Sequence, residues 1–134
     1  LGATLDRGET DLATLVTPAS AEEAARPQVV KAVVSWRDAD FGTALYFSRA
    51  AIPTGTTALF HHIGVYGWCR DALARFVALP PSPLEQVEKL EQLRALEAGM
   101  TIAIGKIDTA PAGIDTAEDL EAARMRAAAA HHKD

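Results

Sequence analysis

The sequence has one cysteine, few aromatic residues and no long apolar run. Cys69 alone cannot form an internal disulfide, and its place beside Trp68 predicts a buried, unreactive thiol. No apolar stretch approaches the ~20 residues that cross a bilayer, so we expect no membrane segment or membrane partner. A reducing, cytoplasmic location fits both observations.

Positive charge is also scarce. Lysine and arginine number 13 against 18 aspartates and glutamates, for a net charge of -5, and they form no basic stripe. This balance argues against a nucleic-acid partner. What is present is ordinary for one globular domain with one hydrophobic core: 134 residues, 49% of them hydrophobic and 23% charged.

Strand-like and helix-like segments alternate along the chain. We expect helices after Ser20 and after the cap Thr116, and others over 71–78 and 84–98, the last ended by Gly99. β-Branched, aromatic and apolar runs predict strands over 12–17, 29–36, 44–49, 63–69 and 100–107. A short polar turn between the second and third of these predicts an antiparallel hairpin. The order favours an α/β fold with that hairpin inserted.

One acid falls among apolar residues. On the helix predicted over 84–98, Glu91 has the same angular position as Leu84, Val87 and Ala95. A buried carboxylate must be hydrogen-bonded, paired or protonated, and Arg94 or Arg49 could be its partner. Two interpretations stay open: a structural ion pair, and a receptor for ligand hydroxyls.

A histidine and a tyrosine flank a glycine on a predicted strand. Side chains two residues apart share a face of a strand, so His62, Gly64 and Tyr66 should point together, with room for a ligand at the glycine. His61 should point to the opposite face, which argues against a metal shared by the two histidines. A structural histidine is the alternative interpretation.

A further carboxylate precedes the last predicted helix. Asp115 lies just before Thr116, where an acid ordinarily compensates the helix dipole. It also follows a strand predicted to be buried, and α/β folds bind ligands in such loops. In that second interpretation Asp115 could hold Mg²⁺, which prefers one or two carboxylates together with substrate phosphates.

Several motifs occur together in one order. They are Pro27-Gln-Val-Val-Lys31, Ala44-Leu-Tyr-Phe-Ser-Arg49, His62-Ile-Gly-Val-Tyr66, Pro83-Leu-Glu-x-x-Glu-x-Leu-Glu91-Gln92-Leu-Arg94 and Gly113-Ile-Asp115-Thr-x-Glu-Asp-Leu120. From about Asp11 to Arg126 the chain resembles the C-terminal half of the 3-deoxy-manno-octulosonate cytidylyltransferases, the CMP-Kdo synthetases. A set of ordered motifs is far more specific than any single one.

The resemblance implies a fold and a reaction. The fold would be a three-layer, Rossmann-like nucleotidyltransferase with a mixed sheet and an antiparallel hairpin insertion. Residues 1–134 would be the sugar-binding and dimerisation half of that single domain, without its N-terminal nucleotide-binding half. In this family CTP and the acid sugar Kdo give CMP-Kdo and pyrophosphate, with Mg²⁺, for lipopolysaccharide synthesis.

The resemblance also implies roles for individual residues. Asp115 matches a metal-binding aspartate and is the expected catalytic residue. The side chains that match the family's sugar-binding residues are Arg49, His62, Tyr66, Glu91 and Gln92. A guanidinium suits a sugar carboxylate, and the other four suit hydroxyl groups.

Two departures from the family's pattern limit this expectation. The family's phosphate-binding loop and its second metal aspartate do not occur here, so we expect the chain by itself to be inactive. The expected partners are CTP, Kdo and a second copy of the chain. Alternatives are a cytidylyltransferase for a related acid sugar, such as 8-amino Kdo or sialic acid, and a dimerising module without catalysis.

Overall fold

The computed structural model describes residues 10–108, and within them strands and short helices alternate. The predicted α/β class is confirmed. In chain order the elements are β1 (Leu12–Pro18), α2 (Ala21–Ala24), β2 (Lys31–Trp36), β3 (Phe41–Ser48), β4 (Phe60–Trp68), α3 (Arg70–Val77), α4 (Pro83–Glu88), α5 (Gln92–Glu97) and β5 (Ile102–Lys106).

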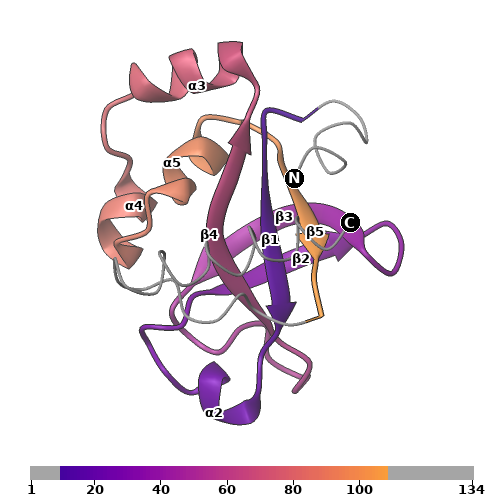
Figure 1. The fold of residues 1–134 in the computed structure, drawn as a ribbon. Helices are drawn as coiled ribbons and strands as arrows, with labels where there is room; N and C mark the ends of the chain where they lie inside the picture. Colours follow the sequence, from indigo (N-terminus) through magenta and orange to yellow (C-terminus); the bar gives the residue numbers. More distant parts are fainter. Residues whose placement is uncertain (1–9, 109–134) are drawn as a thin grey trace, which may run out of the picture.

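The strands form one mixed sheet that closes on itself in the order β1-β4-β2-β3-β5 (Figure 1). Only the β1–β5 pair among these strands is parallel, and the other neighbours are antiparallel. The predicted hairpin is β2–β3, with Lys31 opposite Ser48 and Trp36 opposite Gly42. The three-layer arrangement of a longer nucleotidyltransferase stays a prediction.

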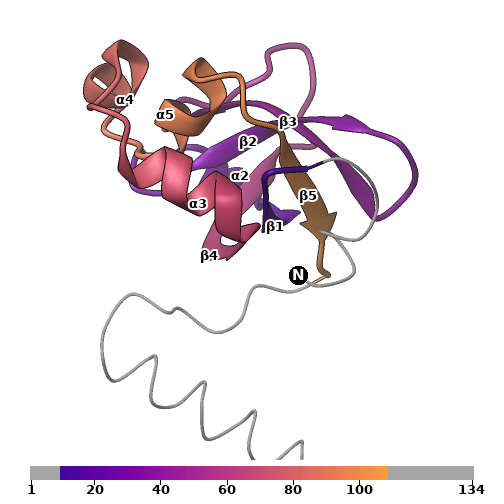
Figure 2. The same ribbon diagram turned by 90° about the horizontal axis from the view of Figure 1, so that it is seen from above.

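The helices divide between the two ends of the sheet. α3, α4 and α5 gather where β4 ends (Figures 1 and 2), and α2 lies at the opposite end (Figure 1). α2 begins at Ser20, as predicted, because the Ser20 hydroxyl accepts from the Glu23 amide while the Glu23 carboxylate accepts from the Ser20 amide. No helix within residues 10–108 has the length and apolar character needed to cross a membrane.

The core fills the space between the strands and the three clustered helices. β1 is the most deeply buried strand: it pairs with β4 and β5, and Leu12, Ala13 and Thr14 have no exposed surface. Its fully buried neighbours come from other strands and from α5, and they include Phe47, Leu93, Ile102 and Ile104. Trp68 turns inward onto Phe76 of α3, with ring centroids 4.9 Å apart.

The prediction of a single helix over 84–98 is wrong. α4 ends at Lys89, which adopts the left-handed conformation (φ 59°, ψ 47°), and α5 follows a cap at Glu91. The left-handed residue costs about 1–2 kcal/mol. The turn carries Leu90 into the core, and burying a leucine contributes about 1.5–3 kcal/mol, which offsets that cost. The predicted end at Gly99 is borne out by its φ of 82°.

Two predictions of burial also need correction. The apolar face expected for Leu84 and Val87 is exposed, because the Lys89 turn directs only the second half of the segment toward the core. Cys69 is exposed rather than buried, with its thiol 3.3 Å from the Thr10 carbonyl oxygen. The inward turn of Trp68, its neighbour, leaves the cysteine at the start of α3.

Candidate functional site

Three segments that are distant in sequence meet beside the clustered helices. They are the end of β3, the middle of β4, and the turn between α4 and α5. Phe47 of β3 lies against His62 of β4, with ring centroids 4.9 Å apart. Ser48 of β3 donates to Glu88 at the end of α4 (3.1 Å). Of the predicted sugar-binding residues, Arg49 lies against the α4–α5 turn, and His62 lies near Tyr66, which the charge of Glu91 reaches.

Arg49 follows β3 and is held by backbone carbonyl groups. Its Nε donates to the Glu88 carbonyl (3.2 Å), its Nη2 to the Lys89 carbonyl (3.3 Å) and its Nη1 to the Pro27 carbonyl (3.2 Å). No carboxylate within residues 10–108 forms an ion pair with it. The guanidinium is thus oriented, and no acid within residues 10–108 neutralises its charge.

His62 is buried and bonded to β1. Its Nε2 lies 2.9 Å from the Thr14 hydroxyl, which also donates to the carbonyl groups of Ile63 (3.0 Å) and Val65 (2.8 Å). Because the only hydroxyl proton of Thr14 serves those carbonyls, the hydroxyl accepts from His62, and the imidazole carries its proton on Nε2. Burial lowers the pKa of His62 to about 4, with a smaller contribution from His61, so the ring is neutral at pH 7 and Nδ1 is an acceptor.

Tyr66 shares a face of β4 with His62, as the sequence predicts. A bulge interrupts the register here, since Thr14 pairs with Tyr66 while Leu15 pairs with Ile63. The bulge contains an even number of residues, Gly64 and Val65, so the alternation of faces is restored. The His62 and Tyr66 rings are 5.6 Å apart. A Cβ atom added to Gly64 would have no neighbour within 4 Å, which agrees with the predicted open space.

The Tyr66 hydroxyl remains protonated. Burial raises the pKa of Tyr66 to about 12, and the negative charge of Glu91 adds to this rise. The phenol is therefore a hydrogen-bond donor at neutral pH, next to a histidine nitrogen that accepts. Such a pair matches a ligand hydroxyl, which both donates and accepts.

Glu91 is exposed, so the premise that it lies on a buried apolar face is wrong. It caps α5 after the chain has turned at Lys89, and its charge acts on Tyr66. Gln92 is buried, and its amide has no hydrogen-bond partner within the described part of the chain. Both side chains thus keep hydrogen-bonding capacity for a ligand.

Arg94, one predicted partner of Glu91, pairs with Glu85 instead. Its Nε and Nη2 donate to the two carboxylate oxygens of Glu85 at 2.8 and 2.5 Å, and its guanidinium lies 4.9 Å from the centre of the Phe76 ring. The pKa of Glu85 is lowered, chiefly by the bonds from Arg94 and then by the Ser82 amide. The structural ion pair considered for Glu91 is therefore absent within residues 10–108, and the Arg94 pair that does form, with Glu85, joins α4 to α5 and α3.

Sequence reasoning missed three residues that support the site. Glu88 accepts from Ser48 and from the Tyr46 hydroxyl, whose pKa is raised by burial first and then by Glu88. Thr14 sets the His62 tautomer. Lys31 lies buried behind Arg49. A lysine inside the apolar run of β2 was the one available signal, because the other two contacts depend on long-range pairing.

His61 points away from His62, as predicted. Its Nδ1 lies 3.4 Å from the Glu23 carboxylate of α2. Within residues 10–108 no three metal-ligating side chains are grouped so that they could hold an ion. The predicted metal residue Asp115 lies outside the described residues.

The fold and this set of side chains define the class: a mixed α/β protein with an oriented guanidinium beside several groups suited to hydroxyls. A family model described as cytidylyltransferase matches residues 1–102. The chain belongs to the cytidylyltransferase family. The resemblance seen in the sequence motifs is confirmed.

Individual relatives agree with this assignment. The 3-deoxy-manno-octulosonate cytidylyltransferase of Parvibaculum lavamentivorans is 57% identical over 121 residues, which are 90% of this chain and 47% of the relative. The corresponding protein of Rhodospirillum centenum is 60% identical over 122 residues, 90% of this chain and 48% of the relative. The chain therefore spans about half the length of the curated relatives it matches.

A solved structure has the same fold. It is a CMP:2-keto-3-deoxy-manno-octonic acid synthetase complexed with CTP, with a TM-score of 0.75 and 38% sequence identity. The match covers 98% of this chain and 54% of that one.

Proposed function

We propose that this chain is the acid-sugar-binding half of a CTP-dependent cytidylyltransferase that activates Kdo for lipopolysaccharide synthesis. The observation that carries the proposal is Arg49, a guanidinium fixed by three carbonyl groups and paired with no carboxylate within residues 10–108. A fixed, unpaired guanidinium suits the carboxylate of an acid sugar. The 57–60% identity to 3-deoxy-manno-octulosonate cytidylyltransferases supports Kdo as that sugar.

The remaining polar groups suit the hydroxyls of the sugar. His62 Nδ1 accepts, the Tyr66 hydroxyl donates, Glu91 accepts and the Gln92 amide does both. A sugar whose hydroxyls are hydrogen-bonded at several points is held in one orientation. Orientation of the attacking group contributes much of the rate enhancement in such a reaction. The role proposed for these residues is thus to bind the sugar and to direct its anomeric hydroxyl at the α-phosphorus of CTP, with pyrophosphate as leaving group.

The rest of the proposal concerns the longer protein. Its nucleotide-binding half would complete a three-layer, Rossmann-like domain, and Asp115 would supply one carboxylate to Mg²⁺, which neutralises phosphate charge. Because the reaction consumes CTP, the proposed location is the cytoplasm. None of these points depends on the geometry of residues 10–108.

A homodimer is also part of the proposal. α3 and α4 expose apolar side chains at their surfaces: Leu73 and Val77 on α3, the valine 68% exposed, and Leu84 and Val87 on α4, the valine 78% exposed. Exposed apolar groups on adjacent helices favour association. Light scattering of the natural-length protein tests this, and a monomer at micromolar concentration would contradict it.

The test of function is pyrophosphate release by the natural-length protein with CTP, Mg²⁺ and each of three sugars: Kdo, 8-amino Kdo and sialic acid. We expect release with Kdo, and an increase in the KM for Kdo of about 100-fold in Arg49→Met, because a charge-assisted contact is lost. Arg37→Met, which removes an exposed arginine that follows β2, is the matched control. Release with another sugar only would replace Kdo in the proposal, and absence of both turnover and sugar binding would favour the dimerising module.

A further inference from the structure

A lysine lies fully buried immediately behind Arg49. Lys31 has no exposed surface, and its ammonium donates to three backbone carbonyl groups: those of Arg26 (2.8 Å), Val29 (2.7 Å) and Arg49 (2.7 Å). An ammonium has three N–H donors, so every donor is used. Three short hydrogen bonds in different directions fix the position of the ammonium group.

The three acceptors come from two separate segments. Arg26 and Val29 lie in the loop between α2 and β2, whereas Arg49 follows β3. The same loop is bonded to Arg49 a second time, since Arg49 Nη1 donates to the Pro27 carbonyl (3.2 Å). The side chain of Arg49 is therefore hydrogen-bonded directly to residues 26–29. Its backbone carbonyl is linked to the same residues through the ammonium group of Lys31.

This arrangement is unfavourable as a means of stability alone. A buried cation is expensive to desolvate, and a second cation lies close by. Burial lowers the pKa of Lys31, and the charge of Arg49 lowers it further. No carboxylate within residues 10–108 pairs with either cation, whereas an apolar residue at position 31 would avoid both costs.

We propose that Lys31 is the positioning residue for Arg49: its three carbonyl bonds hold the Arg49 backbone, and through it the guanidinium, at the place where the substrate carboxylate binds. The inference rests on the proposed function, because it names what holds the acid-binding group of the same site. Lys31 touches no substrate. Its effect is on the affinity for the acid sugar and not on the chemical step.

The experiment is steady-state kinetics of the natural-length protein with Lys31→Met, which keeps the length of the side chain and removes its donors. We expect the KM for Kdo to rise about 10-fold or more, while kcat and the KM for CTP stay within about two-fold. Lys31→Gln, which keeps two N–H donors, should give a smaller rise. It also serves if Lys31→Met does not fold.

A double-mutant cycle separates positioning from a general structural role. In an Arg49→Met background, adding Lys31→Met should change the KM for Kdo by less than about two-fold, because the group it positions is already gone. The inference would be overturned if the two substitutions raised the KM for Kdo by independent factors that multiply in the double variant. It would also be overturned by an unchanged KM for Kdo in a folded Lys31→Met protein.

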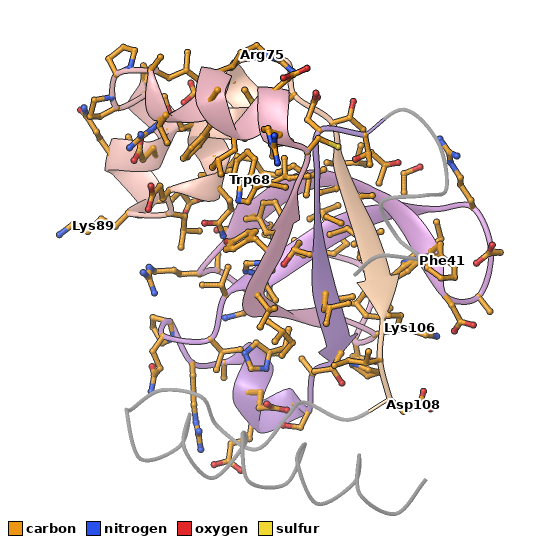
Figure 3. The ribbon with its side chains drawn as sticks, turned by 45° about the horizontal axis from the view of Figure 1, so that its top comes forward. Phe41, Trp68, Arg75, Lys89, Lys106 and Asp108 are labelled. Carbon is orange, nitrogen blue, oxygen red and sulfur yellow. The ribbon has the colours of Figure 1, made fainter. Side chains whose placement is uncertain are left out.

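Two control variants match the changes made. Lys106→Met removes a lysine from β5, on the opposite side of the molecule from Lys89 (Figure 3). Ile102→Ala removes core volume and lowers stability. Neither should alter the KM for Kdo of the folded protein. If the unaltered protein releases no pyrophosphate with Kdo, the proposed function fails; if it does and Lys31→Met behaves like the controls, only the inference about Lys31 fails.

Discussion

The Thr14 hydroxyl accepts a hydrogen bond from His62 Nε2 (2.9 Å) across the β1–β4 pair, and its own proton is shared between the carbonyl groups of Ile63 and Val65 at the β-bulge. One side chain of the deeply buried strand β1 thus stabilises the bulge and sets the histidine tautomer. This relationship makes Nδ1 of His62 the atom that is free to accept from a ligand.

Replacement of Thr14 tests that relationship. Thr14→Val keeps the shape but leaves buried polar groups without partners, so we expect the free energy of unfolding to fall by about 1–3 kcal/mol. Thr14→Ser keeps the hydroxyl and should retain the Nε2–H tautomer. Long-range ¹H–¹⁵N spectra of the imidazole in both variants measure this directly. An Nδ1–H imidazole in the unaltered protein would contradict the assignment.

His62 makes stability depend on pH in a defined window. Its folded pKa of about 4 lies below the ordinary value of 6.5. Above pH 6.5 the histidine is neutral in both states and contributes no pH dependence. As pH falls from 6.5 to about 4, only the unfolded state gains the proton, so stability is lost, by roughly 3 kcal/mol at most.

Urea unfolding at pH 7, 5.5 and 4.5 measures this loss. In His62→Gln the free energy of unfolding should change less over that pH range. His61→Gln is the matched control, since it alters the neighbouring histidine beside Glu23 and leaves the buried ring in place. An equal pH dependence in the unaltered protein and in His62→Gln would show that other groups cause it.

The Glu85–Arg94 pair should hold α4 against α5. Arg94→Met removes both hydrogen bonds, and we expect a lower melting temperature at pH 7. Arg94→Lys should restore only part of the lost melting temperature, because an ammonium cannot form the bidentate contact. The pKa of Glu85 is lowered, so the contribution of the pair is present above the ordinary value of 4.5 and is lost as pH falls below it. A melting difference that persists unchanged at pH 3.5 would contradict this account.

Alanine should destabilise the protein at one strand glycine and be tolerated at another. A Cβ at Gly42 would lie 2.5 Å from the Ser35 carbonyl oxygen and 2.7 Å from Val34 Cγ1, in the β2–β3 hairpin. We expect Gly42→Ala to destabilise by about 1–3 kcal/mol. Gly64→Ala meets no atom within 4 Å and should leave the melting temperature nearly unchanged. Calorimetry on both variants checks the pair, and equal melting temperatures would refute the steric argument.

Much of the fold could be predicted because the signals were local. The Ser20 cap, the β2–β3 hairpin and the end at Gly99 each depend on residues a few positions apart. The His62–Tyr66 pairing was also predicted, but for an incomplete reason: simple alternation fails at the bulge, and the shared face survives because two residues are inserted.

The prediction for Glu91 failed in its reasoning. Helical periodicity assumed one helix over 84–98 and placed the acid on a buried stripe. The left-handed turn at Lys89 is favoured by the burial of Leu90, which depends on a core built from distant strands. Periodicity within a segment carries no information about where the rest of the molecule puts its core.

The sequence by itself determined the α/β class, the hairpin, the family resemblance and the identity of the candidate sugar-binding residues, because these follow from local patterns and ordered motifs. Only the tertiary structure decided which carboxylate pairs with Arg94, that Arg49 has no acid partner within residues 10–108, and that Thr14 and Lys31 support the site. These are contacts between residues 9 to 48 positions apart. The packing that closes the sheet brings them within hydrogen-bonding distance.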